Sequence, residues 1–352
     1  MRQSRKIDHI NYALAAPDQQ EAGFTDVSLL HRSLPELSWD DIDTSCNFLG
    51  KRLTAPLIIN AMTGGHPDVE EINRSLAKGA QRAGVAIALG SQRAALEDKR
   101  VANTFQVVRA ENPDGVVIAN LSAHCTVAEA QQAVDMLTAD AIQLHVNVPQ
   151  ELAMAEGDRQ FNGLTANIAK ISGQLDVPVI IKEVGFGMSM ETVTQIYQTG
   201  VHMIDISGRG GTNFIAIEEQ RYQHDTVLFY DDINQWGLST VISLLETQQL
   251  NLPISTIASG GVRTPYDIAK ALALGAKLVG ISRPFLQTLL EKGEEELHNH
   301  IQQLIIGLRK IMLMCSARDI AKLSIVPAII TGSTAEWLTA RGIDIGRYAK
   351  RK

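Results

Sequence analysis

Eight short runs rich in Ile, Val and Leu recur along the chain, and each is followed by a polar or glycine-rich turn and then by a helical pattern. Strict alternation of strand and helix requires parallel strands joined by crossover helices. Eight such units predict a closed (β/α)8 TIM barrel, and an open doubly wound sheet is the main alternative. The expected strands span residues 56–60, 85–89, 116–120, 141–146, 178–182, 202–206, 254–258 and 277–281.

No compositional linker interrupts this pattern, so we expect the 352 residues to form a single α/β domain. Residues 1–53 are expected to be a polar N-terminal extension, 54–294 the barrel, and 295–352 C-terminal helices. The last region contains the apolar stripe "LIIGLRKIMLMCSA", which is expected to pack either in the core or at an interface. Barrels with such tails often assemble, so we expect a homo-oligomer, a tetramer or larger.

The composition argues against several classes of protein. The net charge of −7 provides no general attraction for nucleic acid or an anionic membrane. No run of about 18 apolar residues predicts a membrane span, and the N-terminus lacks the apolar segment of an export signal. Three widely spaced cysteines without a CxxC pair predict reduced thiols, and we expect a cytoplasmic protein.

Two late loops predict a phosphate site. "ASGGVRTP" follows the seventh expected strand, and its paired Gly260 and Gly261 let the backbone approach a ligand in front of a helix N-terminus. "GISRPF" follows the eighth strand and adds the hydroxyl of Ser282 at another helix start. Barrels commonly bind phosphate between these two loops. The alternative is that the glycines only permit a tight turn.

Two further features lie on the same face of the predicted barrel. "SGRGGTN" follows the sixth strand and is neither a Walker motif nor GxGxxG, so it is either a second phosphate contact, through Thr212, or a flexible lid. Lys182 ends an apolar strand, where its ammonium group is suited to meet a delocalised anion or to act as a Schiff-base nucleophile. The alternative for Lys182 is a structural ion pair with Glu183 or Asp205.

The stretch "IQLHVNVPQEL" at 142–152 alternates like a strand with one polar face. This face carries Gln143, His145 and Asn147, and the stretch continues into Gln150 and Glu151. The pattern predicts a ligand cluster, in which Glu151 offers the hard oxygen that Mg²⁺ takes together with substrate phosphate oxygens. A satisfied polar network at the barrel rim is the alternative.

Basic residues provide further candidates for binding an anion. In "RKIDHI", a helix would place Arg5 and His9 on one face beside Lys6, but charged N-terminal tails are usually just solvated, and these residues alone favour that explanation. Arg93, in "GSQR", is better placed because it directly follows the second expected strand.

Taken in order, these motifs resemble the type 2 isopentenyl-diphosphate isomerases, which are FMN-dependent TIM-barrel enzymes. The resemblance covers nearly the whole chain and rests on "RKxxH" with "HxNxxQE", together with "NAMTGG", "GSQR", "KEVGFGMS", "SGRGGTNF", "QWG", "SGGVR" and "GISRPF". The spacer "FYDDINQWG" differs from the family pattern, so the roles of Asp231 and Asp232 stay open.

The resemblance implies an FMN site, a diphosphate site and a Mg²⁺ ligand. The FMN phosphate would contact Gly261, Arg263 and Ser282. The rest of the cofactor would be surrounded by Ala61, Met62, Thr63, Ser91, Asn120, Lys182, Ser207 and Thr212. The substrate diphosphate would meet Arg5, Lys6, His9, Arg93, His145 and Asn147, with Glu151 holding Mg²⁺ and Gln150 beside the reacting carbons. The implied catalytic residues are Gln150, Lys182 and His145.

The implied reaction interconverts isopentenyl and dimethylallyl diphosphate by a 1,3 proton shift in isoprenoid biosynthesis. No candidate side chain is an obvious strong acid, so reduced FMN is expected to act as the acid/base, with NADPH serving only to reduce it. An FMN-dependent 2-hydroxy-acid oxidase is the first alternative, but it needs an active-site His base, and no His lies near "SGGVR". A catalytically silent phosphate-binding barrel, which would be colourless, is the second.

Overall fold

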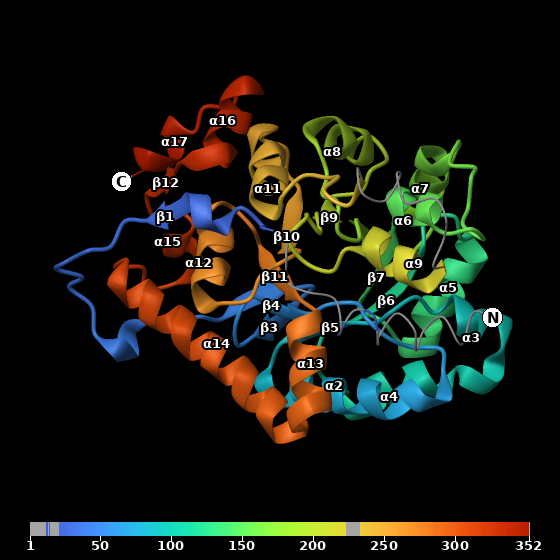
Figure 1. Cartoon of the computed structure of the whole chain (residues 1–352). Helices are drawn as coiled ribbons and strands as arrows, with labels where there is room; N and C mark the ends of the chain where they lie inside the picture. The colour runs from blue at the N-terminus through green and yellow to red at the C-terminus, as the bar shows by residue number, and fades with distance from the viewer. Residues whose placement is uncertain (1–11, 13, 15–20, 223–232, 352) are drawn as a thin grey trace.

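The structure is a computed structural model that describes residues 12, 14, 21–222 and 233–351 (Figure 1). Its centre is a closed barrel of parallel strands in the order β10-β11-β4-β5-β6-β7-β8-β9. This confirms the predicted (β/α)8 TIM barrel and excludes the open sheet. The barrel strands are β4 Leu57–Ile59, β5 Ala86–Ala88, β6 Val117–Ser122, β7 Ala141–His145, β8 Val179–Lys182, β9 Met203–Asp205, β10 Ser255–Ser259 and β11 Leu278–Ile281.

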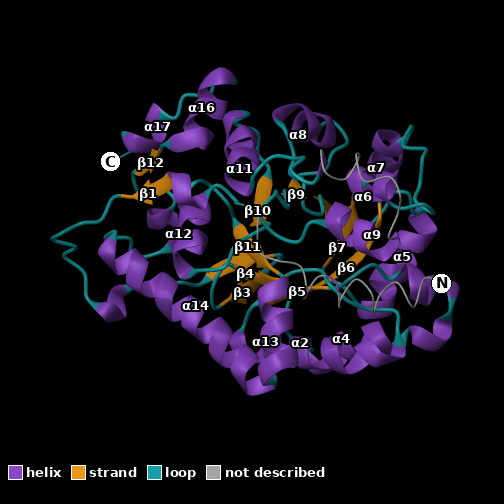
Figure 2. Cartoon of the chain, viewed as in Figure 1, coloured by secondary structure: helices purple, strands orange, loops and turns teal. Residues whose placement is uncertain are grey.

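Helices surround these strands on the outside of the barrel (Figure 2). Some begin where side chains satisfy the first free backbone N–H groups: Thr126 and Thr264 each form a capping box with an acidic residue three positions later. The helices along the barrel are α2 Glu70–Ala83, α3 Arg93–Glu97, α4 Asn103–Glu111, α5 Val127–Leu137, α6 Val148–Ala153, α7 Leu164–Ser172, α8 Met190–Tyr197, α9 Phe214–Tyr222, α11 Thr240–Gln249, α12 Pro265–Ala273 and α13 Arg283–Lys292.

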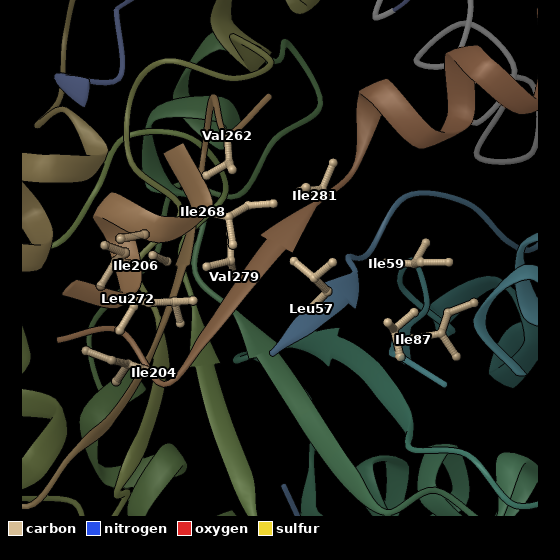
Figure 3. Packing of buried hydrophobic residues seen from close by; sticks show 14 of the residues in the cluster. Leu57, Ile59, Ile87, Ile204, Ile206, Val262, Ile268, Leu272, Val279 and Ile281 are labelled. Atoms are coloured by element: carbon tan, nitrogen blue, oxygen red, sulfur yellow. The ribbon is translucent and has the colours of Figure 1, made fainter. Parts of the chain in front are cut away.

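The two faces of each strand belong to different parts of the core. Leu57 and Ile59 face the surrounding helices, whereas Ile58 between them belongs to the cluster inside the barrel. Figure 3 shows the outer layer, where Ile268 and Leu272 of α12 lie beside residues of the neighbouring strands. Because both faces are buried, the strands read as continuous apolar runs, which is why the sequence reveals them.

The N-terminal extension closes one end of the barrel. A hairpin of β2 Cys46–Phe48 and β3 Lys51–Leu53 places Phe48 and Leu53 in the cluster inside the barrel. Lys51 Nζ lies 2.7 Å from Asp140 Oδ1, just before β7, and donates to the Gly115 carbonyl just before β6. The expectation of a polar lead-in therefore missed a plug that covers the end of the barrel opposite to the polar loops.

The C-terminal region packs against the side of the barrel. It contains α14 Glu294–Met314, α15 Ile320–Leu323, α16 Gly332–Ala340 and α17 Gly346–Ala349. The apolar stripe of α14 is core, since Leu304 and Leu308 are buried, and Gly307 lets α14 approach Pro265 at the start of α12. The expected all-helical tail also contains a strand, β12 Ala328–Ile330, which pairs antiparallel with β1 Val27–Leu29.

The division into residues 1–53, 54–294 and 295–352 stays a prediction. No helix within the described part of the chain has the length and apolar character that a membrane crossing needs.

Candidate functional site

A cavity of about 460 Å³ opens where the strands of the barrel end and the polar loops begin. It is large enough for a cofactor or a drug-sized ligand. Most of the residues that the sequence indicated lie around this cavity. They are Ala61, Met62, Thr63, Ser91, Asn120, His145, Asn147, Gln150, Glu151, Lys182, Ser207, Thr212, Gly261, Arg263 and Ser282.

The basic residues predicted to bind an anion, apart from those already named, are not among the described residues that line the cavity. Arg93 on α3 does not line the cavity; it forms ion pairs with Glu97, at 2.9 Å, and with Glu129. To meet a diphosphate, its guanidinium would have to exchange at least one of these carboxylates for the ligand. Arg5, Lys6 and His9 lie outside the described residues, as do Asp231 and Asp232. The roles of all these residues stay predictions.

One end of the cavity is formed by two glycine-rich loops in backbone contact. Gly260 has a φ of +100°, and a Cβ there would lie 2.0 Å from the carbonyl oxygen of Gly208. Arg263 joins the two loops, because its Nη1 donates to the Gly261 carbonyl and its Nη2 to the Gly210 carbonyl, each at 2.8 Å. Only residues without a Cβ allow this approach, so both loops can present backbone amides to one ligand.

The N-terminus of α13 completes this end of the cavity. Ser282 precedes the helix, and its hydroxyl makes no capping hydrogen bond to α13. Ser282, Arg283 and Pro284 all line the cavity, and Arg283 Nη2 also donates to the Leu14 carbonyl at 3.3 Å. A helix N-terminus next to glycine-rich backbone and an arginine fits the phosphate of a flavin mononucleotide. We call these loops and the start of α13 the phosphate cradle.

Lys182 stands on the cavity wall between two oxygen atoms. Its Nζ lies 3.1 Å from Asp205 Oδ2 and donates to the Glu183 carbonyl at 3.1 Å. Its side chain is 8% exposed, so water screens this charge weakly. The ion pair with Asp205 and the placement at the cavity, which the sequence left as alternatives, occur together.

The carboxylate of Glu183 organises the loop after Lys182. Its Oε2 accepts from the backbone N–H groups of Val184, Gly185 and Phe186 at 2.6, 2.7 and 2.5 Å. Burial raises the pKa of Glu183 to about 7, although these donors and the Lys182 ammonium act to lower it. Val184 and Gly185 line the cavity, so this carboxyl group shapes the cavity without lining it.

Asn147, Gln150 and Glu151 form a connected cluster at the start of α6, on the wall of the cavity. Asn147 Nδ2 donates to Gln150 Oε1 at 3.1 Å and to Glu151 Oε1 at 2.8 Å, and the backbone N–H of Asp158 donates to Glu151 Oε2 at 2.8 Å. Gln150 Nε2 donates to Glu218 Oε1 at 3.1 Å. The side chains at the predicted diphosphate end are thus held in fixed orientations.

Sequence reasoning missed Glu218. It is completely buried on α9 and also forms an ion pair with Arg221 on the same helix. The hint in the sequence is only its spacing of three residues from Arg221, which is common on solvated helices.

Gln143 does not lie at the ligand cavity, where the pattern of the strand predicted it. It is fully buried inside the barrel and does not line the cavity, whereas His145, two residues later on the same face of β7, does. Asn60 and Asp205 join Gln143 in the interior and were not predicted to form a site. Their signal in the sequence is a polar residue at or near the end of an otherwise apolar strand.

The described residues contain no group of three or more His, Cys, Asp or Glu side chains arranged to hold a metal ion. Glu151 alone offers one carboxylate at the cavity, so a Mg²⁺ ion here would need oxygen atoms from a bound phosphate and from water.

Comparisons with known proteins agree with this geometry. Residues 116–328 match the family model of FMN-dependent dehydrogenases. Among solved structures, a mandelate oxidase mutant with an FMN adduct is similar, with a TM-score of 0.65, 16% identity and coverage of 92% of each chain. Mandelate oxidase with (S)-2-phenylpropionate gives a TM-score of 0.64 and 17% identity, with 90% of each chain covered. The class is therefore that of the FMN-dependent dehydrogenase barrels.

Relatives with higher identity define the family. The isopentenyl-diphosphate delta-isomerase of Moorella thermoacetica is 48% identical over 337 residues, which covers 96% of each chain. The protein of the same name from a Geobacillus species is 45% identical over 351 residues, or 99% of each chain. The chain belongs to the isopentenyl-diphosphate delta-isomerase family, as its motifs indicated.

Proposed function

We propose that this protein is an isomerase that interconverts isopentenyl and dimethylallyl diphosphate by a 1,3 proton shift in isoprenoid biosynthesis. Full-length relatives at 48% and 45% identity bear this enzyme's name. The structural observation that carries the proposal is that the phosphate cradle and the cluster of Asn147, Gln150 and Glu151 line one cavity. A flavin nucleotide and a diphosphate would then bind side by side in this cavity.

The residues of the cavity fit FMN. Gly261, Arg263 and Ser282 would hold its phosphate. The remaining contacts would come from Ala61, Met62, Thr63, Ser91, Asn120, Lys182, Ser207 and Thr212, which all line the cavity. When bound and reduced, FMN would supply the acid/base chemistry that no carboxyl or imidazole group of the cavity supplies alone, with NADPH as the reductant. The weakly screened Lys182 ammonium would stabilise negative charge on the cofactor.

The diphosphate would be bound by His145 and Asn147, with Glu151 contributing one oxygen ligand to a Mg²⁺ ion. Arg93 and the N-terminal residues Arg5, Lys6 and His9 would add positive charge. Magnesium shared between one carboxylate and substrate oxygens is the usual arrangement for phosphate esters.

Gln150 would lie beside the reacting carbons, held there by Glu218. The apolar side chains of Met154, Phe214 and Leu286 also line the cavity and would keep water from the alkene. Gln150, Lys182 and His145 are therefore the proposed catalytic residues.

We further propose a cytoplasmic homo-oligomer, a tetramer or larger. Leu34 is 80% exposed and Met314 is 53% exposed, and the backbone N–H of Arg32 donates to the Met314 carbonyl, so these side chains lie on neighbouring segments. Together they support an interface at the segment after β1 and the end of α14.

Anaerobic incubation with FMN, Mg²⁺, NADPH and isopentenyl diphosphate tests the isomerase proposal. We expect dimethylallyl diphosphate to form only when the flavin is reduced. Leu152→Gln is a matched control for Gln150→Leu, since Leu152 lies two residues away, is 46% exposed and does not line the cavity. We expect Gln150→Leu to lower kcat by about 100-fold, as for a group at the reacting atoms, and Leu152→Gln to leave it within about two-fold.

The shared barrel makes a flavin-dependent 2-hydroxy-acid oxidase the second candidate. Such an enzyme needs a histidine base, and His145 is the one histidine among the described residues that line the cavity. Oxygen consumption and hydrogen peroxide formation with lactate or mandelate would favour the oxidase. Isomerase activity without oxygen consumption would exclude it.

A further inference from the structure

A buried carboxylate beneath the cavity collects hydrogen bonds from several strands. Asp205, at the end of β9, is completely buried and does not line the cavity. Its Oδ2 accepts from Asn60 Nδ2 at 2.6 Å and lies 3.1 Å from Lys182 Nζ. Its Oδ1 accepts from Ser259 Oγ at 2.5 Å and from the backbone N–H of Ser207 at 3.3 Å. The negative charge is therefore fully satisfied without any contact to a ligand.

A chain of amide side chains connects this carboxylate to His145. Gln143 Nε2 donates to Asn60 Oδ1 at 3.2 Å and to Asp205 Oδ2 itself at 3.5 Å, and Asn120 Nδ2 donates to Gln143 Oε1 at 3.2 Å. His145 Nδ1 lies 2.9 Å from Asn120 Oδ1. We call Asn60, Gln143 and Asn120 the amide relay. It crosses the barrel interior from β9 by way of the end of β4 to β7 and β6.

The direction of every hydrogen bond in the amide relay follows from its end at Asp205. An ionised carboxylate only accepts, so Asn60 must turn its NH₂ group toward Asp205. The Asn60 oxygen then faces Gln143, and the backbone N–H of Ala61 also donates to this oxygen at 2.9 Å. Two independent donors therefore fix which atom of the Asn60 amide is oxygen.

The same reasoning continues to the histidine. Gln143 uses its NH₂ group toward Asn60, which leaves its oxygen for the NH₂ group of Asn120. The Asn120 oxygen then faces the imidazole, and an oxygen acceptor requires a proton on His145 Nδ1. In the neutral ring the unprotonated nitrogen is then Nε2.

We propose that Asp205 is a positioning residue that sets the tautomer of His145 through the amide relay while it holds Lys182 directly. Two groups on the cavity wall are thereby oriented by one buried charge. A consequence, which rests on the proposed diphosphate function, is that His145 donates to a diphosphate oxygen only after its Nε2 has taken up a proton, because Nε2 of the neutral ring has no proton to donate. The amide relay provides for His145 what a carboxylate partner provides for many active-site histidines, but through intervening amide side chains.

The tautomer is directly measurable. The FMN-bound protein with ¹⁵N-labelled histidine rings is examined by NMR at a pH where the ring is neutral, and the signals of His145 are assigned by their loss in His145→Gln. We expect a protonated Nδ1 and an unprotonated Nε2 in the unmodified protein. The opposite tautomer there would overturn the proposal without any further variant.

Two substitutions test the role of the amide relay. Gln143→Met keeps the volume but removes the hydrogen bonds of Gln143 to Asn60, Asn120 and Asp205, and Asp205→Asn removes the acceptor-only end. We expect both to give a mixture of tautomers or the Nε2-protonated form. Ser259→Ala is the matched control, because it removes a hydrogen bond to the same carboxylate outside the amide relay. Unchanged tautomers in both variants, with FMN still bound, would show that the network is only structural and would overturn the proposal.

Calorimetric titration with inorganic pyrophosphate and Mg²⁺ tests the consequence for the ligand. At a pH where the ring is neutral, binding by the unmodified protein is expected to be accompanied by proton uptake, measured from the heats in buffers of different ionisation enthalpy. We expect less proton uptake in Gln143→Met, whose neutral ring can carry its proton on Nε2, and unchanged uptake in Ser259→Ala. Equal proton uptake in Gln143→Met and the unmodified protein would overturn this consequence. If the unmodified protein fails to bind pyrophosphate, the diphosphate function fails, while the NMR result still decides the role of Asp205.

Discussion

Replacement of Gly260 by alanine is a sharp test of the phosphate cradle. The residue has a φ of +100°, where an L side chain is strained by about 1–3 kcal/mol. Its new Cβ would also lie 2.0 Å from the backbone oxygen of Gly208, which is a severe steric clash. Separating the two loops is expected to cost about 1–3 kcal/mol more, as in other overpacked sites. We therefore expect Gly260→Ala to destabilise the protein by roughly 2–6 kcal/mol.

Gly200→Ala separates the two contributions. Gly200 has a φ of +84°, and no atom lies within 4 Å of the position that a Cβ would take there, so only the backbone strain applies. The difference in the free energy of unfolding between the two variants therefore measures the contact with Gly208. We expect that difference to be about 1–3 kcal/mol.

The two variants should also differ in FMN affinity, measured by quenching of flavin fluorescence. Displacement of the loops removes backbone donors to a charged phosphate, and each such bond contributes about 1.5–3 kcal/mol. We expect Gly260→Ala to raise the Kd for FMN by about ten-fold or more and Gly200→Ala to leave it unchanged. Native FMN affinity in a folded Gly260→Ala variant would refute the assignment of the cradle.

Three further predictions concern acidic residues. The pKa of Glu183 rises from 4.5 to about 7 on folding, so the folded state binds more protons between these values. The unmodified protein should therefore lose about 3 kcal/mol of stability relative to Glu183→Gln as the pH rises through this window, and denaturant titrations showing no such change would contradict the assignment. Glu246 is buried, pairs with Arg341 and accepts a hydrogen bond from the indole of Trp337 on α16. Glu246→Leu should therefore lower the free energy of unfolding in urea by roughly 2–4 kcal/mol. Glu191 is the exposed partner of the same arginine, so Glu191→Gln should lower the free energy of unfolding by under about 1 kcal/mol. Equal losses of stability in the two variants would argue against this role of Glu246. In Glu151→Gln, Mg²⁺ should no longer strengthen pyrophosphate binding, and retained metal dependence in calorimetry would place the ion elsewhere.

The barrel could be predicted because its strands are apolar on both faces, so that composition alone distinguishes them from the helices between them. The hairpin of β2 and β3 and the pair of β1 and β12 could not. These strands are not apolar on both faces, since Ser28, Asn47 and Arg52 at the centres of β1, β2 and β3 are exposed. Their partners are set by tertiary packing against the barrel rather than by local pattern.

The cavity could be predicted because loops that follow the strands of a barrel converge at one end. The sequence could not predict how deep each side chain lies in the barrel, below the end where these loops converge. Gln143 and His145 share a face of β7, yet one is in the interior and the other at the cavity. Glu218 became visible only through the packing of α9 on α6, and Arg93 requires knowledge of its partners Glu97 and Glu129.

The central claim is a proton shift without net oxidation, and the incorporation of solvent deuterium tests it most directly. The FMN-bound protein is incubated anaerobically in D₂O with Mg²⁺, NADPH and isopentenyl diphosphate, and the substrate is followed by proton NMR. The account predicts deuterated dimethylallyl diphosphate and no further consumption of NADPH once the flavin is reduced. Unchanged isopentenyl diphosphate in the presence of a bound and fully reduced flavin would contradict it.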